Sequence, residues 1–453
     1  MNIIDSIKAT LPASVRPESG TLLVALSGGA DSVCLLLALQ EMGYSVAALH
    51  CNFELRGLES DGDEAFCRRL CRARGVNLRV RHFRTQSHAR RQGISTEMAA
   101  RQLRYAWFRE EVEAQGAQAL CVAHHRDDSI ETLLLNLIRG TGLHGLTGLR
   151  PERQLQDGLT VLRPLLQVSR ADIERWLTER GQTWVTDSTN LSAEAAQRNA
   201  IRLELLPLME KMNPRVREGL AETAARLSEA EALYDQAVAV NREHIMTPDG
   251  AIDVPALLAT PAPRTMLHEL LTPLSFTPEQ VGEIYEGLSG EPGHLWRSST
   301  HRLLRDRGRL LVEPLDGSNA VTQSTMVREW VLPLEGLFEA PGHQRLLVRR
   351  HAVVDGSFQV PRDLQTVCMD LEKLQLPLVL RTPHEGDRFQ PFGMEGTRLV
   401  SDYLTDKKLS LFDKERQLLV TSGQQIVWLV GMRAASGFEV DASTRHVMTI
   451  TLL

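Results

Sequence analysis

The chain has 453 residues, 43% hydrophobic and 24% charged, with a formal net charge of −6. This composition is typical of a globular protein with more than one core, and it excludes fibrous and largely disordered classes. No stretch approaches the roughly 18 uninterrupted apolar residues of a membrane span, the first residues carry no apolar signal core, and the six cysteines fit reduced thiols better than a disulfide frame. We expect a cytoplasmic protein without a membrane partner.

Residues 21–123 alternate between two patterns. Short, apolar runs at 21–26, 45–50, 76–82 and 119–123 are typical of buried parallel strands. Helical patterns lie between them at about 31–42, 59–74 and 96–115, and another follows at about 128–139. This alternation predicts an α/β fold with a doubly wound parallel sheet, in which ligands bind beyond the carboxyl ends of the strands.

A strand, a Ser/Gly turn and a helix start follow one another in LLVALSGGADS, residues 22–32. Glycines without Cβ atoms let backbone N–H groups approach a ligand, and the helix N-terminus favours anions. An acid at Asp31 is repulsive beside phosphate unless a metal lies between them, so the loop predicts a nucleotide with Mg²⁺. The plain alternative is a turn with ordinary first-turn helix residues. The predicted nucleotide-binding residues are Ser27, Gly28, Gly29, Ala30, Asp31 and Ser32.

The fourth strand is followed by AHHRDDSIET. Asp128 and Glu131 are three residues apart, so they share one helix face and suit either metal binding or proton transfer. Helix capping and surface ion pairs are the alternative. Adjacent histidines point in different directions and no cysteine completes a zinc set. In the preceding helix Arg101 and Arg104 are also three apart, and a fixed guanidinium there suits charge on phosphorus; a salt bridge to Glu97 is the alternative for Arg101.

The negative net charge hides a local asymmetry. Residues 66–109 contain twelve arginines and one acid, Glu97, and residues 297–309 contain five arginines and one acid, Asp306. Such clusters on an acidic chain predict one basic face. From about 169 to 288 the pattern is mainly helical, with a long helix at about 214–244; short β-like runs dominate the end. We expect domains at 1–213, 214–315 (helical) and 326–453 (small α+β), with a linker at 316–325.

The loop resembles the PP-loop of the ATP pyrophosphatase superfamily, whose domains have an adenine nucleotide alpha hydrolase-like fold. Further strings narrow the resemblance. They are HCNFELRGLESDGDEAF from His50, STEMAARQLRYAWF from Ser95, AHHRDDSIETLLLNLIRGTGLHGLTGL from Ala123, TDSTN from Thr186 with RNAIR from Arg198, and RTPHEGDRFQPFGMEGTRLVSDYLTDKKL from Arg381. Together they are similar to the tRNA(Ile)-lysidine synthetases, over about 20–210 and in the tail.

The resemblance implies a carbon–nitrogen ligase. Its members use ATP to adenylate the C2 oxygen of the wobble cytidine in a CAU-anticodon tRNA(Ile), and an amine of L-lysine then displaces AMP. The lysidine formed reads AUA instead of AUG. The expected ligands are therefore ATP, Mg²⁺, L-lysine and this tRNA. The sequence does not decide whether the protein is a monomer or a homodimer.

The resemblance also assigns residues. It implies catalytic roles for Asp31, Arg104, Asp128 and Glu131, metal binding by Asp31 and Asp128, and a place beside the nucleotide for His124. The residues implied in tRNA binding are Arg56, Arg101, Asn190, Arg198, Arg202, Arg388, Arg398, Lys407 and Lys408. Glu54 stands where the family commonly has His, which leaves the role of that position open.

Three other classes of protein fit the sequence less well. A PP-loop thiolase needs catalytic cysteines or a CxxC cluster site, whereas Cys67 and Cys71 are spaced CxxxC. An amidotransferase-type synthetase needs an ammonia supply, and no N-terminal nucleophilic cysteine is visible. A nucleotide-binding or tRNA-binding module without chemistry would have no need of the three carboxylates.

Overall fold

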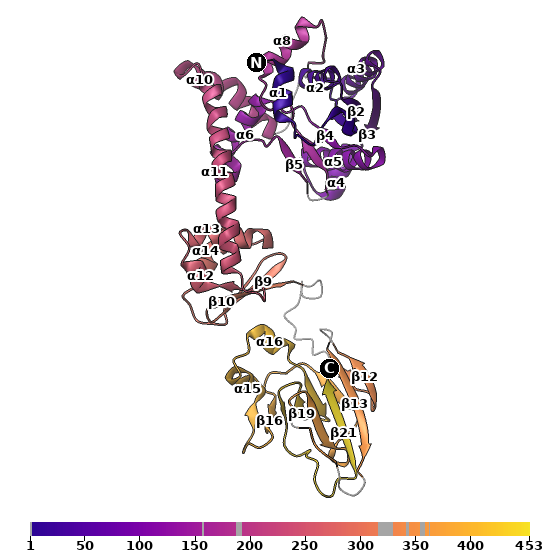
Figure 1. The fold of residues 1–453 in the computed structure, drawn as a ribbon, viewed down its shortest axis with the longest axis vertical. Helices are drawn as coiled ribbons and strands as arrows, with labels where there is room; N and C mark the ends of the chain where they lie inside the picture. Colours follow the sequence, from indigo (N-terminus) through magenta and orange to yellow (C-terminus); the bar gives the residue numbers. More distant parts are fainter. Residues whose placement is uncertain are drawn as a thin grey trace. The chain divides into compact units, whose positions relative to one another are not determined.

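The computed structural model describes residues 2–155, 158–186, 193–315, 329–340, 344–353, 358–361 and 363–453. The chain divides into two compact units, Met1–Gln236 and Ala237–Leu453, which Figure 1 colours from indigo through magenta to yellow along the sequence. The linker predicted at 316–325 lies outside the described residues. Within the described residues, no helix has both the length and the apolar character needed to cross a membrane.

The first unit contains the predicted doubly wound sheet. In spatial order its six strands are β3 (Asn77–His82), β2 (Ser45–Asn52), β1 (Thr21–Ala25), β4 (Ala119–Cys121), β6 (Thr160–Leu162) and β5 (Glu152–Gln154). All pair in parallel except β5, which is antiparallel to β6. The strand order reverses between β1 and β4, and such a switch point is where open α/β sheets bind ligands.

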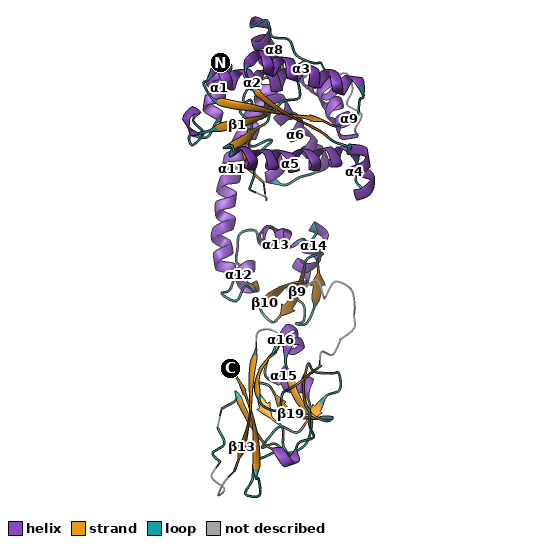
Figure 2. Cartoon of the chain, turned by 90° about the vertical axis from the view of Figure 1, so that its right-hand side faces the viewer, coloured by secondary structure: helices purple, strands orange, loops and turns teal. Residues whose placement is uncertain are grey.

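Helices cover both faces of this sheet (Figure 2). Leu22 and Val24 of β1 pack into one core, whereas Leu23 packs into the other, as the alternation of a strand requires. The first core includes residues of α1 (Ile3–Thr10), α2 (Ala30–Glu41), α3 (Leu58–Arg74) and α8 (Arg170–Glu179). The second core includes α5 (Thr96–Gln115), which is packed against α4 (Thr85–Gln92).

The remaining helices of this unit follow β4. They are α6 (Arg126–Arg139), α7 (Leu143–Leu146), α9 (Ala193–Ala200), a π-helical turn at Ile201–Leu205, α10 (Leu206–Met212) and α11 (Val216–Ile245). Helix α11, predicted at 214–244, runs across the division between the units. A small core around Ile130, Leu134 and Leu206 joins α6 to the π-helical turn and α10.

The second unit begins with three helices and a four-stranded antiparallel sheet. The helices are α12 (Val254–Leu258), α13 (Pro263–Leu271) and α14 (Pro278–Gly287), and the strands, in spatial order, are β7 (Ile252–Asp253), β10 (Arg309–Pro314), β9 (His301–Asp306) and β8 (Leu295–Arg297). The sequence indicated the helices but not these strands, because frequent arginines in residues 297–309 interrupt the apolar pattern around Leu303, Leu304 and Leu310.

The rest of the second unit is built on two sheets that share one core around Trp428 and Met448. One sheet orders β11 (Glu329–Val331), β15 (Leu378–Arg381), β18 (Leu419–Ser422), β19 (Gln425–Leu429) and β20 (Arg433–Ala434). The other orders β12 (Gly336–Glu339), β13 (Arg345–Ala352), β21 (His446–Leu452) and β14 (Thr366–Asp370). A hairpin and two helices complete it: β16 (Arg388–Phe389), β17 (Arg398–Leu399), α15 (Val400–Asp406) and α16 (Leu411–Arg416).

Within the described residues, short 3₁₀ turns lie at Pro17–Ser19, Thr272–Leu274 and Leu371–Lys373.

Candidate active site

The loop after β1 is organised by the hydroxyl group of Ser32. This oxygen accepts the N–H groups of Ser27 and Gly28, both at 3.2 Å, and donates to the carbonyl of Gly29 at 3.0 Å. Ser32 is buried. The prediction that Ser32 donates to phosphate is untested, but in this structure its hydroxyl shapes the loop from inside. The N–H groups of the first turn of α2 then remain to receive an anion.

Gly28 is required by both conformation and space. Its φ of +94° is unfavourable for other residues. A Cβ atom there would lie 3.3 Å from Cys67 Sγ and from Val185 Cγ2. The turn therefore packs tightly against α3 and against the segment before residue 187.

Asp31 lies in the first turn of α2, and its two carboxylate oxygens have different surroundings. Oδ2 accepts a hydrogen bond from Arg170 Nη1 at 2.5 Å. Oδ1 is buried and has no hydrogen-bond partner among the described residues. Burial raises the pKa of Asp31, against the opposing charges of His125 and Arg170. A buried carboxylate oxygen without a partner is costly, so this atom marks a place for a cation or a donor.

His125 lies between Asp31 and Asp128. It caps α6: Asp128 Oδ2 accepts the His125 N–H at 2.9 Å, and His125 Nδ1 accepts the Asp128 N–H at 3.4 Å. Because Nδ1 accepts this hydrogen bond, Nε2 is the ring nitrogen that carries a proton and can donate. That atom is 3.7 Å from Asp31 Oδ1 and 3.6 Å from Asp128 Oδ2. The strands β1 and β4, adjacent in the sheet, thus bring these three side chains together.

His125 was not among the predicted site residues, although a signal for it exists. A capping box pairs an N-cap side chain with an acid three residues later, and His125 and Asp128 have this spacing. Histidine is not a usual N-cap residue, which hid the pattern. The cap also fixes the direction in which Asp128 points.

Glu131 is held by Arg202 in a two-pronged ion pair. Arg202 Nε and Nη2 donate to Glu131 Oε1 and Oε2 at 2.7 and 3.0 Å, and Nη2 is 4.0 Å from Asp128 Oδ1. The Glu131 side chain is only 1% exposed, whereas Asp128 is 18% exposed. Asp128 is therefore the more accessible carboxylate. Arg202 sits in the π-helical turn, an element often found at functional sites.

Asp127, on α6, links this helix to α8 and α11. Its Oδ2 accepts the backbone N–H of Arg170 on α8 at 2.9 Å, and its Oδ1 pairs with Arg217 Nη1 on α11 at 2.7 Å. Burial opposes ionisation, but the Arg170 N–H, His125 and Arg217 together lower the pKa of Asp127. Arg170 is thus fixed at its backbone by Asp127 while its guanidinium holds Asp31.

His124 is an acceptor in this structure. Its Nδ1 accepts the Nε–H of Arg163 at 3.3 Å. Burial, with a contribution from Arg163, lowers the pKa of His124 to about 4, so the ring is neutral at pH 7. The nearby Arg198 also contributes to this effect, and its Nε is buried without a hydrogen-bond partner among the described residues. A place for His124 beside a nucleotide stays a prediction.

The two arginines predicted on α5 are exposed. The guanidinium of Arg104 lies 5.1 Å from the ring centre of Phe53, and that of Arg101 lies 5.2 Å from that of Tyr105. In the described part of the chain neither guanidinium forms a hydrogen bond or ion pair with Asp31, Asp128 or Glu131. Both guanidinium groups are accessible, which a role in binding an incoming substrate requires.

The segment after β2 carries Arg56 and Glu54. Arg56 Nη2 pairs with Asp63 Oδ2 at 2.8 Å. Glu54, at the position where the family commonly has His, has a φ of +53° and its Oε1 is 3.4 Å from His82 Nδ1. In this protein the imidazole beside this position belongs to His82 on β3. Both contacts are local, and neither involves the Asp31 cluster.

The predicted tRNA-binding residues of the tail gather around β16, β17 and α15. Arg388 is exposed on β16, and Arg398 pairs with Asp406. Lys407 Nζ lies 5.7 Å from the ring centre of Tyr403, and Lys408 is exposed with a φ of +62°. Asn190 lies outside the described residues. Contact of any of these residues with RNA stays a prediction.

The cysteines are structural in this region. Cys67 and Cys71 are buried, and desolvation raises the pKa of their thiols to about 12 and about 11. Thiols with such pKa values are not ionised at neutral pH and are poor nucleophiles. This finding disfavours persulfide or disulfide chemistry at the CxxxC pair.

The carboxylates fit the magnesium ion that the loop predicts. Among the described residues no three His, Cys, Asp or Glu side chains are grouped as a metal site. Magnesium, however, is usually bound through one or two carboxylates together with phosphate oxygens and water. Asp31 Oδ1, buried and without a partner, and the neighbouring Asp128 provide such a pair.

Family models match three parts of this chain. A PP-loop domain model matches residues 3–209, a TilS substrate binding domain model matches 249–315 and a TilS substrate C-terminal domain model matches 378–450. The tRNA(Ile)-lysidine synthase of Parabacteroides distasonis is 44% identical over 437 residues, covering 96% of each chain. That of Bacteroides thetaiotaomicron is 43% identical over 427 residues, covering 94% of each. That of Dehalococcoides mccartyi is 31% identical, covering 95% of this chain and 94% of its own.

Proposed function

Because this chain belongs to the tRNA(Ile)-lysidine synthase family, we propose that it attaches L-lysine to the wobble cytidine of a CAU-anticodon tRNA(Ile). ATP is the energy source, AMP and pyrophosphate are the products, and the modified anticodon reads AUA instead of AUG. We further propose that the PP-loop domain, 1–213, performs the chemistry and that 214–315 and 326–453 bind the tRNA.

One observation carries this proposal. The helix N-terminus that would bind phosphate lies beside a carboxylate, Asp31, with one buried oxygen that has no partner. Across the switch point of the sheet, His125 Nε2 lies 3.7 Å from this oxygen and 3.6 Å from Asp128 Oδ2. A phosphate site with two acids is electrostatically sensible only with a cation, as in magnesium-dependent nucleotide chemistry.

In the first step the cytidine O2 attacks the α-phosphorus of ATP. The new O–P bond forms while the bond between the α-phosphorus and the bridging oxygen breaks, and pyrophosphate leaves. The first-turn N–H groups of α2 hold phosphate oxygens. Asp31 and Asp128 would hold Mg²⁺, which neutralises phosphate charge when it is bound. Arg170 keeps Asp31 in position, and Arg104 is proposed to stabilise the charge on phosphorus.

In the second step an amine of lysine attacks C2 of the activated cytidine. The C2–N bond forms, the C2–O bond breaks, AMP leaves, and the attacking nitrogen loses a proton. Asp128 is the more exposed carboxylate and suits the proton transfer. Glu131 reaches a ligand only if Arg202 yields one of its two hydrogen bonds. We therefore propose that Glu131 acts mainly by fixing Arg202, which frees Asp128 to meet the lysine ammonium.

Transfer of radiolabelled L-lysine to a CAU-anticodon tRNA(Ile) transcript tests the proposal. ATP-dependent incorporation that disappears when the wobble cytidine is replaced by uridine supports both reaction and substrate. Pyrophosphate release without lysine incorporation would keep the adenylation step and require a different nucleophile. Neither product, from protein that binds ATP, would favour a binding module.

A further inference from the structure

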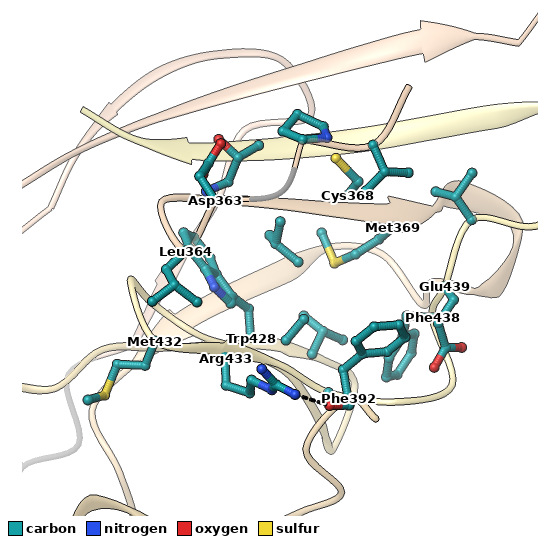
Figure 3. A pocket seen from close by; sticks show the side chains of 18 of the residues that line it. Asp363, Leu364, Cys368, Met369, Phe392, Trp428, Met432, Arg433, Phe438 and Glu439 are labelled. Carbon is teal, nitrogen blue, oxygen red and sulfur yellow. Dashed lines mark hydrogen bonds between the residues drawn. The ribbon is translucent and has the colours of Figure 1, made fainter. Parts of the chain in front are cut away.

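The second unit contains a cavity of about 770 Å³ between its two sheets. One wall is the edge strand β14, with Cys368 and Met369, and the other is formed by β19 and β20, with Trp428 and Arg433 (Figure 3). Ligand pockets in proteins usually measure about 300–1,000 Å³. The cavity is therefore large enough for one nucleoside-sized molecule.

The mouth of this cavity carries exposed apolar side chains. Phe392 is 49% exposed, Val360 50% and Leu364 57%, although all three line the cavity. Deeper in, Trp428 and Phe438 are buried. Isolated exposed apolar residues are ordinary, but several around one hollow are typical of a binding site.

Phe392 is presented on a fixed turn. Its N–H donates to the carbonyl of Ala434 at 2.9 Å, and its carbonyl accepts from Arg433 Nη2 at 2.5 Å. The Met394 N–H closes the turn on the carbonyl of Pro391 at 3.0 Å. The ring thus projects from a held backbone, so stacking a ligand on it costs little conformational entropy. The turn belongs to the tail string RFQPFGMEG.

The polar groups of the cavity indicate which ligand fits. Asp363 Oδ1 accepts the Thr366 N–H at 2.7 Å, and Glu439 Oε1 accepts the Gly437 N–H at 2.9 Å. The second oxygen of each carboxylate can accept a further donor. Among the described residues that line the cavity, Arg433 is the one cation, against these two acids. A phosphate inside would be repelled, whereas a flat ring with an amino group would stack on Phe392 and donate to a carboxylate.

We propose that this cavity takes an unpaired base of the tRNA that carries an exocyclic amino group (adenine, cytosine or guanine), with the phosphates remaining outside the mouth. The inference rests on the proposed function, which makes tRNA the substrate that this unit contacts. Aromatic stacking with a carboxylate acceptor selects a base that carries an exocyclic amino group over uracil.

The test uses the full chain and a fluorescein-labelled CAU-anticodon tRNA(Ile) transcript. Phe392→Ala should weaken binding about 5- to 100-fold, because stacking on one aromatic ring is worth that much. The salt dependence of the binding constant should be unchanged, since no phosphate contact is lost. Phe392→Trp should restore most of the affinity. Leu337→Ala is the matched control, because Leu337 lies on β12 of the same unit and is 52% exposed.

Wild-type affinity in Phe392→Ala would overturn the proposal. A weaker complex with a flatter salt dependence, or with a lower melting temperature than the Leu337→Ala control, would also overturn it, because the loss would then be electrostatic or structural. The lysine-transfer assay is independent of this comparison. Normal transfer with normal binding by Phe392→Ala removes only the cavity proposal. Absence of transfer in wild type, with the expected binding pattern, removes only the proposed reaction.

A second transcript, lacking the unpaired nucleotides at its 3′ end, identifies the source of the base. If the base comes from that end, removal weakens wild-type binding by the same factor as Phe392→Ala, and the variant loses nothing more. If it comes from a loop, Phe392→Ala still weakens binding of the shortened transcript. Either pattern supports a base in the cavity.

Discussion

Charged residues are concentrated in two regions of the first unit, and the two regions differ in how far the charges are buried and paired. The carboxylate junction, at the ends of β1 and β4, consists of Asp31, Asp127, Asp128 and Glu131 with their partners His125, Arg170, Arg202 and Arg217. Its acids are buried or half-buried and three of them pair with an arginine. The arginine segment, residues 66–109, has exposed arginines on α3, β3, α4 and α5 and one acid. Buried acids paired with arginines fix geometry for chemistry, whereas exposed arginines that outnumber the nearby acids attract a polyanion.

The sharpest test of this comparison is Asp31→Asn in the carboxylate junction. Lysine transfer should fall at least about 100-fold, because the charge beside the phosphates is lost. The tRNA dissociation constant should stay within about twofold, since Asp31 has no place in the basic surface. The matched control is Glu174→Gln, which removes a carboxylate from the other side of Arg170 without touching Asp31. A large loss of tRNA affinity in Asp31→Asn would show that the two regions are not separate.

The reverse test removes charge from the arginine segment. Arg84, Arg90 and Arg91, at the start and end of α4, are exposed and form no ion pair with another described residue. Changing all three to Gln should weaken tRNA binding about 10- to 100-fold and reduce the salt slope by roughly 2 to 3, because phosphate contacts release counterions.

The control for this test is the double change Arg79→Gln and Arg81→Gln. These arginines on β3 are neutralised by Glu111 and Glu110 in the free protein. Replacing Arg79 and Arg81 should therefore reduce the salt slope of tRNA binding less than replacing the three arginines of α4. Equal slopes in both variants, measured by fluorescence anisotropy between about 50 and 300 mM salt, would contradict a docking role for α4.

A smaller effect is expected behind the carboxylate junction. Asp127→Asn should lower the free energy of unfolding by about 1–3 kcal/mol, because it weakens bonds to Arg170 N and Arg217. The pKa of Asp127 is lowered in the folded state despite its burial. Its contribution is therefore present above the unfolded pKa, about 4, and is lost as pH falls through the folded value.

Thermal melting of wild type and Asp127→Asn from pH 7 downwards measures this. The difference between their melting temperatures should narrow below about pH 4. Arg217→Met should show a similar loss, and the double variant should lose little more than either single one. A pH-independent difference would show that the carboxylate charge of Asp127 does not contribute.

The smallest effect on catalysis is expected from the cysteines. Cys67→Ala and Cys71→Ala should leave lysine transfer within about twofold of wild type, because these buried thiols with raised pKa values take no part in the reaction. Cys67→Ala should cost some stability, since Cys67 packs against the loop at Gly28. Loss of transfer at unchanged melting temperature would revive a role for the CxxxC pair.

The local sequence pattern predicted most strands and helices of the sheet domain in the first unit. The strands β1 to β4 and helices α2, α3 and α5 lie within a few residues of the expected ranges, because buried parallel strands and amphipathic helices have distinct periods. The sheet in residues 252–314 was not expected, since its apolar positions are separated by arginines whose stems cover apolar surface. The loop glycine at 28 was identified from sequence, but its second reason, the contact with Cys67 and Val185, was not.

The sequence by itself determined which residue types meet at the ends of β1 and β4. The alternation of strands and helices sets the switch point, and both Asp31 and Asp128 follow strands that end there. Only the tertiary structure decided how each carboxylate is used. Arg170, Arg202 and Arg217 come from helices 43 or more residues further along the chain than the acids of α6 that they contact. Such pairs depend on how helices pack, and no local period records that packing.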